Sequence, residues 1–420
     1  VVVDTAATRV ESIYRFHNIK TTASLVYTNK IPTGTYRGFG NPQGTLMVEC
    51  VMDMLAEKLH MDPTQIRLVN ATQPGDVSLN GWKMGSCELS QCIEKAKALS
   101  HWEEHKANKR FGHGIGIGCC IHVNGNRSVY PQFDGSSASI RLNDNGDAVV
   151  VCSDGDIGQG ASTVFTQIAA EELGLSAERV HVKRVNTNYS DFAFGAFASR
   201  ITLNAGNAVR DAARKLKCML LETASRISGY AADDITIQNG VFRASNWQAT
   251  IRDVTMEYLY EHGGLFPKAE GFFMPKDVVV ADKKTKYGNI SPAYSFGAHV
   301  AEVNIDPKTG KVHLVNYVAV HDTGTVINPM LAEGQIEGGV VQGIGYALYE
   351  DYHFDDNGNV LNSSFLDYKL PTILDVPQIT CDFADSFEPN GPFGAKGVGE
   401  PSIVPVAPAI ANAIYDAIGV

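Results

Sequence analysis

The sequence has no stretch of the roughly 18–20 consecutive apolar residues that a helix needs to cross a bilayer. Its first five residues include neither a methionine nor the charged region that opens a signal peptide. We therefore expect no membrane span and no secretion signal. The start reads like the interior of a longer chain or the product of a cleavage.

Blocks of basic residues are also missing, and the formal net charge is −11 at pH 7. Such a chain repels a polyanion at long range, so we expect no nucleic acid among its partners. The balance of 44% hydrophobic and 19% charged residues is ordinary for a globular protein.

The eight cysteines include no Cys-x-x-Cys pair. Zinc-ribbon and ferredoxin spacings are therefore excluded. We expect buried free thiols in a reducing compartment, which predicts a cytoplasmic location. If the protein performs redox chemistry, an iron–sulfur cluster has to belong to another chain or domain.

A length of 420 residues is too great for one compact core and predicts two or three domains. Apolar spacing predicts a helix from Asn41, with Asn41 as its cap and Pro42 as its first residue, a second helix over 63–68 and a third over 93–109. The polar, glycine-containing segment 72–86 lies between them, and it is the first candidate boundary.

Further along the chain the pattern changes to a mixture of strands and helices. Hairpins are predicted at 139–152 and 298–320, and a turn at 355–358. Helices are predicted at 163–173 and 406–418, and a strand at 180–185. Because strands and helices are mixed rather than strictly alternating, α+β is the expected fold class.

Two glycine-rich motifs each precede a predicted helix. The first, Tyr36 to Gly44, flanks Arg37 and Phe39 with glycines, and the second contains Gly158, Gln159 and Gly160. Glycine lets a backbone approach a ligand closely, and a helix start offers free N–H donors. The alternative for each motif is an ordinary tight turn that leads into a helix.

Two further segments carry polar groups along predicted helices. The run 195–210 places hydroxyl and amide groups at helical spacing, although simple helix capping would explain it too. The segment 334–345 reads as a helix despite its five glycines. Each interior glycine costs about 0.5–1 kcal/mol relative to alanine, so close approach of a backbone or ligand is the expected reason. Gln335 and Gln342 share one face of this helix.

The last motif runs from Gly391 to Pro401 and ends on Glu400. Pro401 is expected to hold Glu400 in an extended conformation. A carboxylate placed between small residues in a desolvated site suits general-base chemistry. A single glutamate taken by itself is more often a surface or capping residue.

Together and in this order, the five motifs resemble the large subunit of the molybdenum hydroxylases, the xanthine dehydrogenase and aldehyde oxidoreductase family. The resemblance covers essentially the whole chain. It implies two elongated mixed α/β molybdopterin-binding domains, with residues 1–86 as the end of the first and 87–420 as the second. The segments 41–44, 77–87 and 388–396 look more like bacterial multi-subunit members, including the 4-hydroxybenzoyl-CoA reductase alpha subunit type. Bacterial purine, nicotinate or aldehyde dehydrogenases fit nearly as well.

The resemblance implies a role for each motif. In that family a glutamate of the Gly-Glu-Pro turn is the base that deprotonates a water-derived hydroxyl at molybdenum, and by position it is Glu400. Arg37 would assist catalysis and, with Phe39, Phe133 and Phe197, contact the substrate. The residues implied to hold the cofactor are Gly158, Gln159, Gly160, Ser199, Arg200, Thr202, Asn204, Gln335, Gln342, Gly397, Val398 and Gly399.

The implied cofactor is molybdenum held by a molybdopterin dithiolene without a direct protein ligand, in the cytosine dinucleotide form. The family's large subunit also has an N-terminal half that these residues do not include. We therefore expect the missing half, an iron–sulfur subunit and an FAD subunit as partners, with the clusters and the flavin on those chains.

The expected function is hydroxylation, or reductive dehydroxylation, of an aromatic, heteroaromatic or aldehyde carbon of a small-molecule substrate. The alternative is a metal-free module with the same fold that serves assembly or interaction. The presence of Glu400, Gln159 and Gln342 together argues against that alternative.

Overall fold

The computed structural model describes residues 2–127 and 133–419. The chain divides into two compact units. Unit 1 consists of Val1–Asn124, Val278–Pro389 and Lys396–Val420, and unit 2 consists of Gly125–Asp277 and Asn390–Ala395. Both combine helices with sheets, so the predicted α+β class is confirmed.

The core of unit 1 is a four-stranded sheet in the order β1-β9-β10-β11. The long strands β1 (His113–Val123), β9 (Tyr294–Ile305) and β10 (Val312–Asp322) pair antiparallel, and β11 (Ile379–Phe383) joins β10 in parallel. The pair β9–β10 is the hairpin predicted at 298–320, with Gly310 in the left-handed conformation (φ 71°) of its turn.

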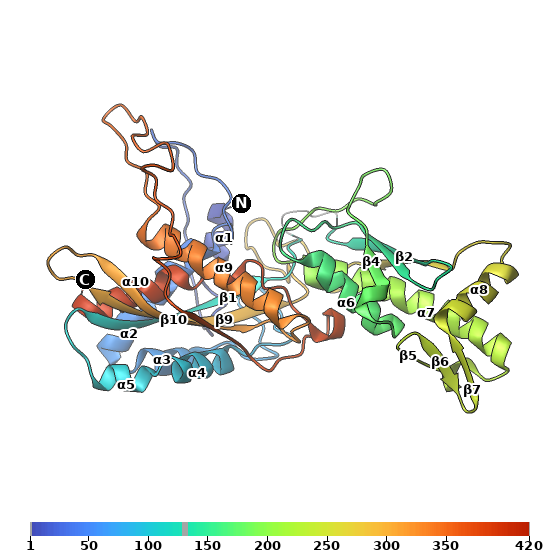
Figure 1. Ribbon diagram of the computed structural model, residues 1–420. Coiled ribbons are helices and arrows are strands. Elements are labelled where there is room, and N and C mark those ends of the chain that lie inside the picture. The colour runs from blue at the N-terminus through green and yellow to red at the C-terminus, as the bar shows by residue number, and fades with distance from the viewer. Residues whose placement is uncertain (1, 128–132, 420) are drawn as a thin grey trace. The chain divides into compact units, whose positions relative to one another are not determined.

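Helices cover both faces of this sheet (Figure 1). On one face α9 (Pro329–Leu348) and α10 (Val406–Ile418) bury the main apolar cluster against β9 and β10. On the other face lie α4 (Leu89–Leu99) and α5 (Trp102–Ala107). The helices α1 (Val2–Arg9), α2 (Asn41–Leu59) and α3 (Pro63–Asn70) complete the unit.

Strand β1 carries glycine at every second position, at 114, 116 and 118. A Cβ atom on any of them would collide with the backbone of the segment 405–417. Glycine therefore lets this segment and α10 lie directly on the strand, and the even-numbered residues of β1 all face it.

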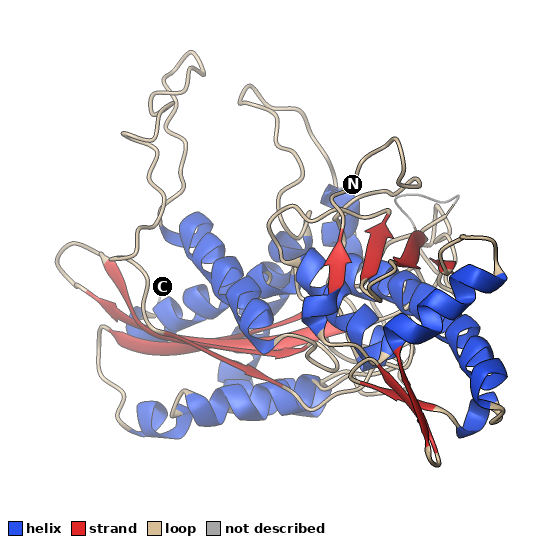
Figure 2. Cartoon of the chain, turned by 45° about the vertical axis from the view of Figure 1, so that its right-hand side comes forward, coloured by secondary structure: helices blue, strands red, loops and turns tan. Residues whose placement is uncertain are grey.

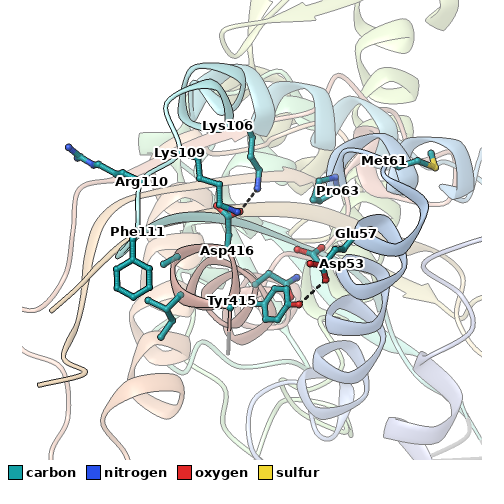
Figure 3. Close-up of a pocket in the computed structure, with 14 residues that line it drawn as sticks. Asp53, Glu57, Met61, Pro63, Lys106, Lys109, Arg110, Phe111, Tyr415 and Asp416 are labelled. Carbon is teal, nitrogen blue, oxygen red and sulfur yellow. Dashed lines mark hydrogen bonds and ion pairs between the residues drawn. The ribbon is translucent and has the colours of Figure 1, made fainter. Parts of the chain in front are cut away.

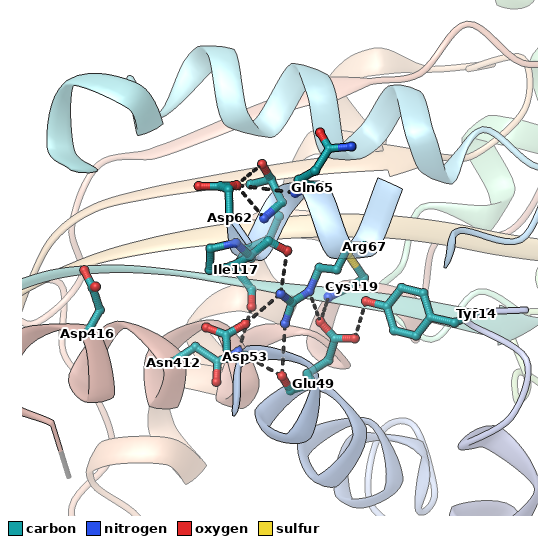
Figure 4. A network of polar contacts seen from close by, with 12 residues as sticks. Tyr14, Glu49, Asp53, Asp62, Gln65, Arg67, Ile117, Cys119, Asn412 and Asp416 are labelled. Atoms are coloured by element: carbon teal, nitrogen blue, oxygen red, sulfur yellow. Dashed lines mark hydrogen bonds and ion pairs between the residues drawn. The ribbon is translucent and has the colours of Figure 1, made fainter. Parts of the chain in front are cut away.

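A buried ion pair lies where α2, α3 and β1 meet (Figure 4). Arg67 donates from Nε to Glu49 at 2.8 Å and pairs with Asp53 at 2.6 Å. Glu49 also accepts from the Tyr14 hydroxyl at 2.5 Å and from the Cys119 backbone N–H at 2.8 Å. Burial lowers the pKa of Arg67, but the two carboxylates outweigh burial and raise that pKa above its usual value.

Unit 2 is built on a second four-stranded sheet in the order β4-β3-β2-β8. Its elements are β2 (Ser136–Leu142), β3 (Ala148–Cys152), β4 (Val180–Val182), β8 (Lys268–Phe273), α6 (Ala161–Leu173) and α7 (Gly206–Ser228). Helix α7 packs on β2 and β8, and α6 packs on α7. A Cβ on Gly271 of β8 would collide with the backbone of α7, so glycine permits this close packing.

A small antiparallel sheet of β5 (Thr236–Gln238), β6 (Val241–Ala244) and β7 (Trp247–Thr250) leads into α8 (Ile251–Glu261). Thr250 and Asp253 form a capping box at the start of α8. The described chain also has 3-10 helices at Ala177–Arg179, Ala232–Asp234, Pro392–Gly394 and Pro401–Ile403, and a π-helix at Ile201–Ala205.

Three local predictions need correction. The helix predicted at 93–109 is two helices, α4 and α5, separated where His101 adopts a left-handed conformation (φ 52°). The strand predicted at 180–185 ends at Val182. Gly40 (φ 110°), not Asn41, occupies the cap position of α2, because the Asn41 side chain turns toward β1 instead.

Two expectations concern the chain as a whole. All eight cysteines are free thiols. Cys218 is exposed. None of the helices in the described ranges 2–127 and 133–419 is long and apolar enough to cross a membrane.

Candidate functional site

The Gly-Glu-Pro turn lies beside the end of β1 in unit 1. Cys120 of β1 contacts the Pro401 carbonyl, and two residues further His122 contacts Glu400. Strand β1 and the segment that leads into α10 thus run along each other, and the strand presents an imidazole to the carboxylate.

Glu400 does not have the extended conformation that Pro401 was expected to impose. Its backbone is right-handed helical (φ −97°, ψ −33°), and its carbonyl accepts a hydrogen bond from Ile403 that opens the 3-10 helix Pro401–Ile403. The preference before proline is a bias, and here a helical turn with two side-chain hydrogen bonds outweighs it.

The carboxylate of Glu400 is held at both oxygens. Oε2 accepts from His122 Nε2 at 2.9 Å, and Oε1 accepts from the Gly38 backbone N–H at 3.2 Å. Its side chain is 16% exposed, whereas that of His122 is fully buried. The carboxylate is therefore fixed in orientation and still has one open side.

Asn41 determines which nitrogen of His122 carries the proton. Asn41 Nδ2 donates to the Ile121 carbonyl at 2.6 Å, which identifies that atom as the amide nitrogen. The same atom lies 3.1 Å from His122 Nδ1, so Nδ1 is the acceptor and Nε2 carries the hydrogen that Glu400 receives. Thr45 donates to Asn41 Oδ1 at 3.1 Å and completes the chain.

The electrostatics favour an ionised Glu400 beside a neutral His122. Burial alone would raise the pKa of Glu400, but the His122 imidazole, the Gly38 N–H and the Arg37 charge lower it below its usual value. Burial lowers the pKa of His122, and the Glu400 charge offsets this only in part. At neutral pH the glutamate is thus ready to accept a proton.

Arg37 connects three of the predicted motifs. Its Nε donates to the Gly399 carbonyl at 2.6 Å, and Nη1 donates to Gln342 Oε1 at 3.3 Å. Nη2 donates to Gln335 Oε1 at 3.3 Å and to the Ser402 hydroxyl at 2.9 Å. Residues about 300 positions apart in sequence are therefore joined at one guanidinium beside the Gly-Glu-Pro turn.

Phe39 is buried and packs against the ring of His122. It is 5% exposed, and its ring meets the His122 ring edge-to-face at 5.7 Å between centroids. Its backbone is left-handed (φ 36°), like that of the flanking Gly38 and Gly40. A Cβ on Gly40 would collide with the Val2 carbonyl, so this glycine is required by packing.

The five glycines of α9 serve different purposes. A Cβ on Gly339 or Gly343 would collide with Ser402 or Val406, so these two allow the helix to contact the segment after Glu400. A Cβ on Gly345 would likewise collide with the Glu350 carboxylate. Gly334 and Gly338, one turn apart, have open space around them and leave the helix backbone exposed next to Gln335.

In unit 2, the turn before α6 is closed mainly by its own residues. Asp156 accepts from the N–H groups of Gly158 and Ser162, both at 2.9 Å. Gln159 Oε1 accepts from Ile157 N–H at 2.6 Å, and its Nε2 donates to the Gly155 carbonyl at 3.3 Å. Gly158 (φ 108°) is exposed with open space around it, and Gly160 (φ 82°) is the cap residue of α6.

The run 199–204 contains a fully buried ion cluster. Arg200 donates to Asp134 at 2.8 Å, to Asp154 at 2.6 Å and to the Gly135 carbonyl at 2.6 Å. Asn204, also buried, donates to the Asp134 carbonyl at 3.0 Å. The buried side chains of Arg200 and Asn204 thus hold the loop in its conformation. Ser199 (φ 51°) and Thr202 are half-buried.

The predicted substrate-side phenylalanines of unit 2 lie close to these residues. Phe133 packs against Phe194 at 4.8 Å between ring centroids, and Phe197 lies 6.0 Å from the Arg200 guanidinium. Residues 128–132, which directly precede Phe133 in the chain, lie outside the described residues.

The predicted site residues therefore form two groups. Arg37, Phe39, Gln335, Gln342 and 397–400 gather in unit 1, and the others belong to unit 2. The sequence reasoning did not identify His122 or Asn41. The alternation of glycines at even positions of β1 was a usable signal, because it places His122 on the face that meets the C-terminal segment.

A separate polar pocket of about 500 Å³ lies in unit 1 between α2, α5 and α10 (Figure 3). Several of its polar groups contact one another: Lys106 and Lys109 each contact Asp416 at 2.9 Å, and Tyr415 donates to Glu57 at 2.8 Å. Among the described residues that line it, none belongs to the predicted site.

Models of the molybdopterin cofactor-binding domain match residues 95–377 and 1–71. The chain belongs to this family, that of the molybdenum hydroxylase large subunits. It is 35% identical to the xanthine dehydrogenase molybdenum-binding subunit of Escherichia coli O157:H7, over 94% of this chain and 52% of that one. It is 30% identical to the nicotine 6-hydroxylase large subunit of Paenarthrobacter nicotinovorans, over 99% of this chain and 52% of that one.

Solved structures agree with this assignment. The quinoline 2-oxidoreductase of Pseudomonas putida 86 superimposes with a TM-score of 0.87 at 26% identity, over 99% of this chain and 54% of that one. The aldehyde oxidoreductase of Desulfovibrio desulfuricans ATCC 27774 gives a TM-score of 0.82 at 28% identity, over 100% of this chain and 43% of that one. The chain thus spans about half the length of the relatives that it matches.

The residues of unit 1 fit the cofactor of this family. A pterin presents amide and amine edges, and the groups gathered at Arg37 are two carboxamides, a hydroxyl and a guanidinium. The bare backbone at Gly334 and Gly338 leaves room for a flat ring beside them.

Proposed function

We propose that this chain is the C-terminal, base-bearing part of a molybdenum hydroxylase large subunit, with Glu400 as the general base. The observation that carries the proposal is the fixed, ionised carboxylate of Glu400, held by His122 and Gly38 next to the Arg37 cluster. The reaction class is oxidation of an aromatic, heteroaromatic or aldehyde carbon with oxygen from water, or its reductive reverse.

When bound, the molybdenum cofactor supplies the oxygen and accepts the two electrons. The residues of this chain provide the proton chemistry and the positioning. Glu400 takes up the released proton on a carboxylate oxygen whose orientation His122 Nε2 and Gly38 N–H fix. Its 16% exposure admits a reacting group and leaves little room for bulk water. General bases of this kind contribute about 10²–10⁴-fold to rate.

Arg37, Gln335 and Gln342 are proposed to hold the pterin side of the site. Arg37 also donates to the Gly399 carbonyl. A ligand that contacts the amides of Gln335 and Gln342 is therefore held at a fixed position relative to Glu400. The segment 397–399 is proposed to offer backbone groups to the cofactor, because its side chains are small. Phe39 supports the site through His122, and its predicted stacking on substrate would require the ring to move from its buried position.

For unit 2 we propose a cofactor-binding role through its exposed backbone. Gly158, Gln159, Gly160, Ser199 and Thr202 offer half-buried or exposed groups near helix starts, a common setting for phosphate. Arg200 and Asn204 would act indirectly, by holding this loop. Phe133 and Phe197 are kept as proposed substrate-side aromatics.

The finer identity of the cofactor and partners is also proposed. We propose the cytosine dinucleotide form of the cofactor, and we propose FAD on a partner chain. Iron–sulfur clusters are also proposed on a partner chain, because the described cysteines are dispersed free thiols. The domain boundary is proposed near residue 86, between the segments matched by the two family models.

The missing half of the large subunit is proposed to cover two apolar arms of unit 1, defined as residues 19–31 and 361–374 (Figure 2). Leu25 is 80% exposed, Phe365 80% and Leu374 92%. Such an accumulation of exposed apolar side chains marks an interaction site. The arms project from one region of the unit, since Gly358, beside the second arm, approaches the Asn29 carbonyl of the first.

The test is the substitution Glu400→Gln in the assembly that contains the N-terminal half and the partner chains. Molybdenum content is measured by mass spectrometry, and turnover is followed with a dye acceptor and xanthine, nicotine, quinoline or an aldehyde. We expect molybdenum content to be unchanged and turnover to fall about 10²–10⁴-fold. Glu257→Gln, an exposed residue of α8, is the matched control. Full activity of Glu400→Gln would remove the base assignment, and an assembly without molybdenum would favour a metal-free module.

A further inference from the structure

Two histidines and a glutamate meet on the face of the unit 1 sheet that carries α4 and α5. His113 opens β1, and Glu302 lies on the paired strand β9, opposite Ile115. His113 and Glu302 are therefore diagonal neighbours on one face of an antiparallel pair. His105 reaches them from α5. Three separate elements thus direct metal-binding side chains toward one point.

The ligand atoms are already close. His113 Nε2 lies 2.8 Å from Glu302 Oε1, and His105 Nε2 lies 3.5 Å from Glu302 Oε2. The three possible ligand atoms all lie within 4.8 Å of one another. The two imidazole rings are 5.2 Å apart between centroids and tilted by 32°.

We propose that His105, His113 and Glu302 bind one zinc ion. Zinc takes imidazole and carboxylate ligands in tetrahedral sites with bonds of about 2.0–2.2 Å, which places ligand atoms about 3.3 Å apart. Small side-chain movements bring the observed separations to this value. Two neutral imidazoles and one carboxylate are also the ligand set of known three-residue zinc sites.

The surroundings favour a cation. The side chain of Glu302 is 12% exposed and that of His113 is 11% exposed, so the carboxylate has little water to solvate its charge. Lys106 and Lys109, close to His105 in the chain, both pair with Asp416 in the polar pocket (Figure 3) rather than with Glu302. A divalent ion would balance Glu302 where no lysine does so among the described ion pairs.

We assign water as the fourth ligand of the zinc ion. The His105 side chain is 22% exposed, so the site opens to solvent on the side of α5. Because α5 is a six-residue helix, a metal that joins it to β1 and β9 would fix its position on the sheet. The site is separate from that of Glu400, and its open fourth position is typical of zinc sites with three protein ligands.

The test uses the full 420-residue chain, stripped of metal with a chelator. Zn²⁺ is titrated by calorimetry, and Co²⁺ is used as a probe because its visible absorption reports four-coordinate geometry. The variants are His113→Gln and Glu302→Gln, and the control is His101→Asn. His101 is an exposed histidine at the start of α5 in a left-handed conformation that asparagine tolerates.

We expect one zinc per chain, a Co²⁺ spectrum of the four-coordinate type, and at least tenfold weaker binding in both site variants. Zinc should raise the melting temperature of the wild-type chain and of His101→Asn, but not that of the site variants. Circular dichroism checks that each variant is folded. Stoichiometric zinc binding that is equal in all four proteins would overturn the proposal, as would the absence of binding to the wild-type chain. Molybdenum content and turnover do not enter this test, so it is independent of the Glu400 assignment.

Discussion

His122 Nε2 donates to Glu400 Oε2 at 2.9 Å, and Asn41 fixes the tautomer that makes this donation possible. The imidazole is fully buried, whereas the carboxylate has one open side. A hydrogen bond to the charged form of an acid lowers its pKa. His122 is thus a positioning residue for the proposed base, and it contributes both orientation and charge state.

His122→Leu is predicted to change the pH dependence of turnover. Glu400 acts as a base only when ionised, so turnover falls as pH drops through its pKa. Loss of the His122 hydrogen bond removes the main contribution that lowers this pKa, and burial then raises it. The acidic limb of the kcat profile should therefore move to higher pH, and kcat at neutral pH should fall about tenfold or more.

The control for this prediction is His122→Gln, whose side-chain amide can still donate to Glu400. It should keep the acidic limb close to that of the wild-type protein. If both variants lose activity equally without any movement of the pH profile, His122 serves packing alone.

The sequence was sufficient to predict the fold class and most elements, because their signals are local. The hairpin at 298–320 follows from alternation around Asp306 to Gly310, and α3 begins directly after its cap residue Asp62, which accepts from Thr64 N–H at 2.8 Å. The break between α4 and α5 was missed because a single histidine is only a weak signal for a left-handed turn.

The sequence predicted some residues of the candidate site, but not their contacts and not His122 or Asn41. Five motifs identified Glu400, Arg37 and the glutamine pair, and the structure brings those of unit 1 together. The role of His122 depends on the pairing of β1 with the C-terminal segment, about 280 residues away in the chain, which no local pattern specifies. Similarly, the conformation of Glu400 was mispredicted because its long-range hydrogen bonds overrode the influence of Pro401.

Arg37→Lys is predicted to weaken the link between the glutamine pair and the Gly-Glu-Pro turn. Lysine keeps the charge but cannot donate to Gly399, Gln342 and Ser402 together. Turnover should fall about 10–100-fold, since the loss of one hydrogen bond to a charged group costs about 1.5–3 kcal/mol. Steady-state kinetics of the loaded assembly measure this. Arg226→Lys, at an exposed ion pair with Glu261 in unit 2, should have no effect on turnover.

Glu49→Gln is predicted to destabilise unit 1 strongly. Glu49 and Arg67 are both fully buried, and the substitution leaves Arg67 with Asp53 as its nearby carboxylate. Removing one partner of a buried ion pair costs about 3–5 kcal/mol. Urea unfolding, followed by circular dichroism, should show this loss in the free energy of unfolding. Glu57→Gln, on the same helix but paired with Tyr415 at the surface, should cost less than about 1 kcal/mol.

The apolar arms give a prediction about assembly. Leu25 and Val26 are 80% and 71% exposed in the first arm, and Phe365 and Leu366 are 80% and 76% exposed in the second. Serine substitutions at either pair should leave the melting temperature of the isolated chain unchanged, because these side chains bury little surface within it. They should weaken binding to a separately expressed N-terminal half by at least tenfold, since burying such side chains contributes about 1.5–3 kcal/mol each. Leu265→Ser, an equally exposed leucine of unit 2, is the control. Calorimetry of the two halves decides the outcome: equal affinities for all variants would mean that the arms face solvent or another partner.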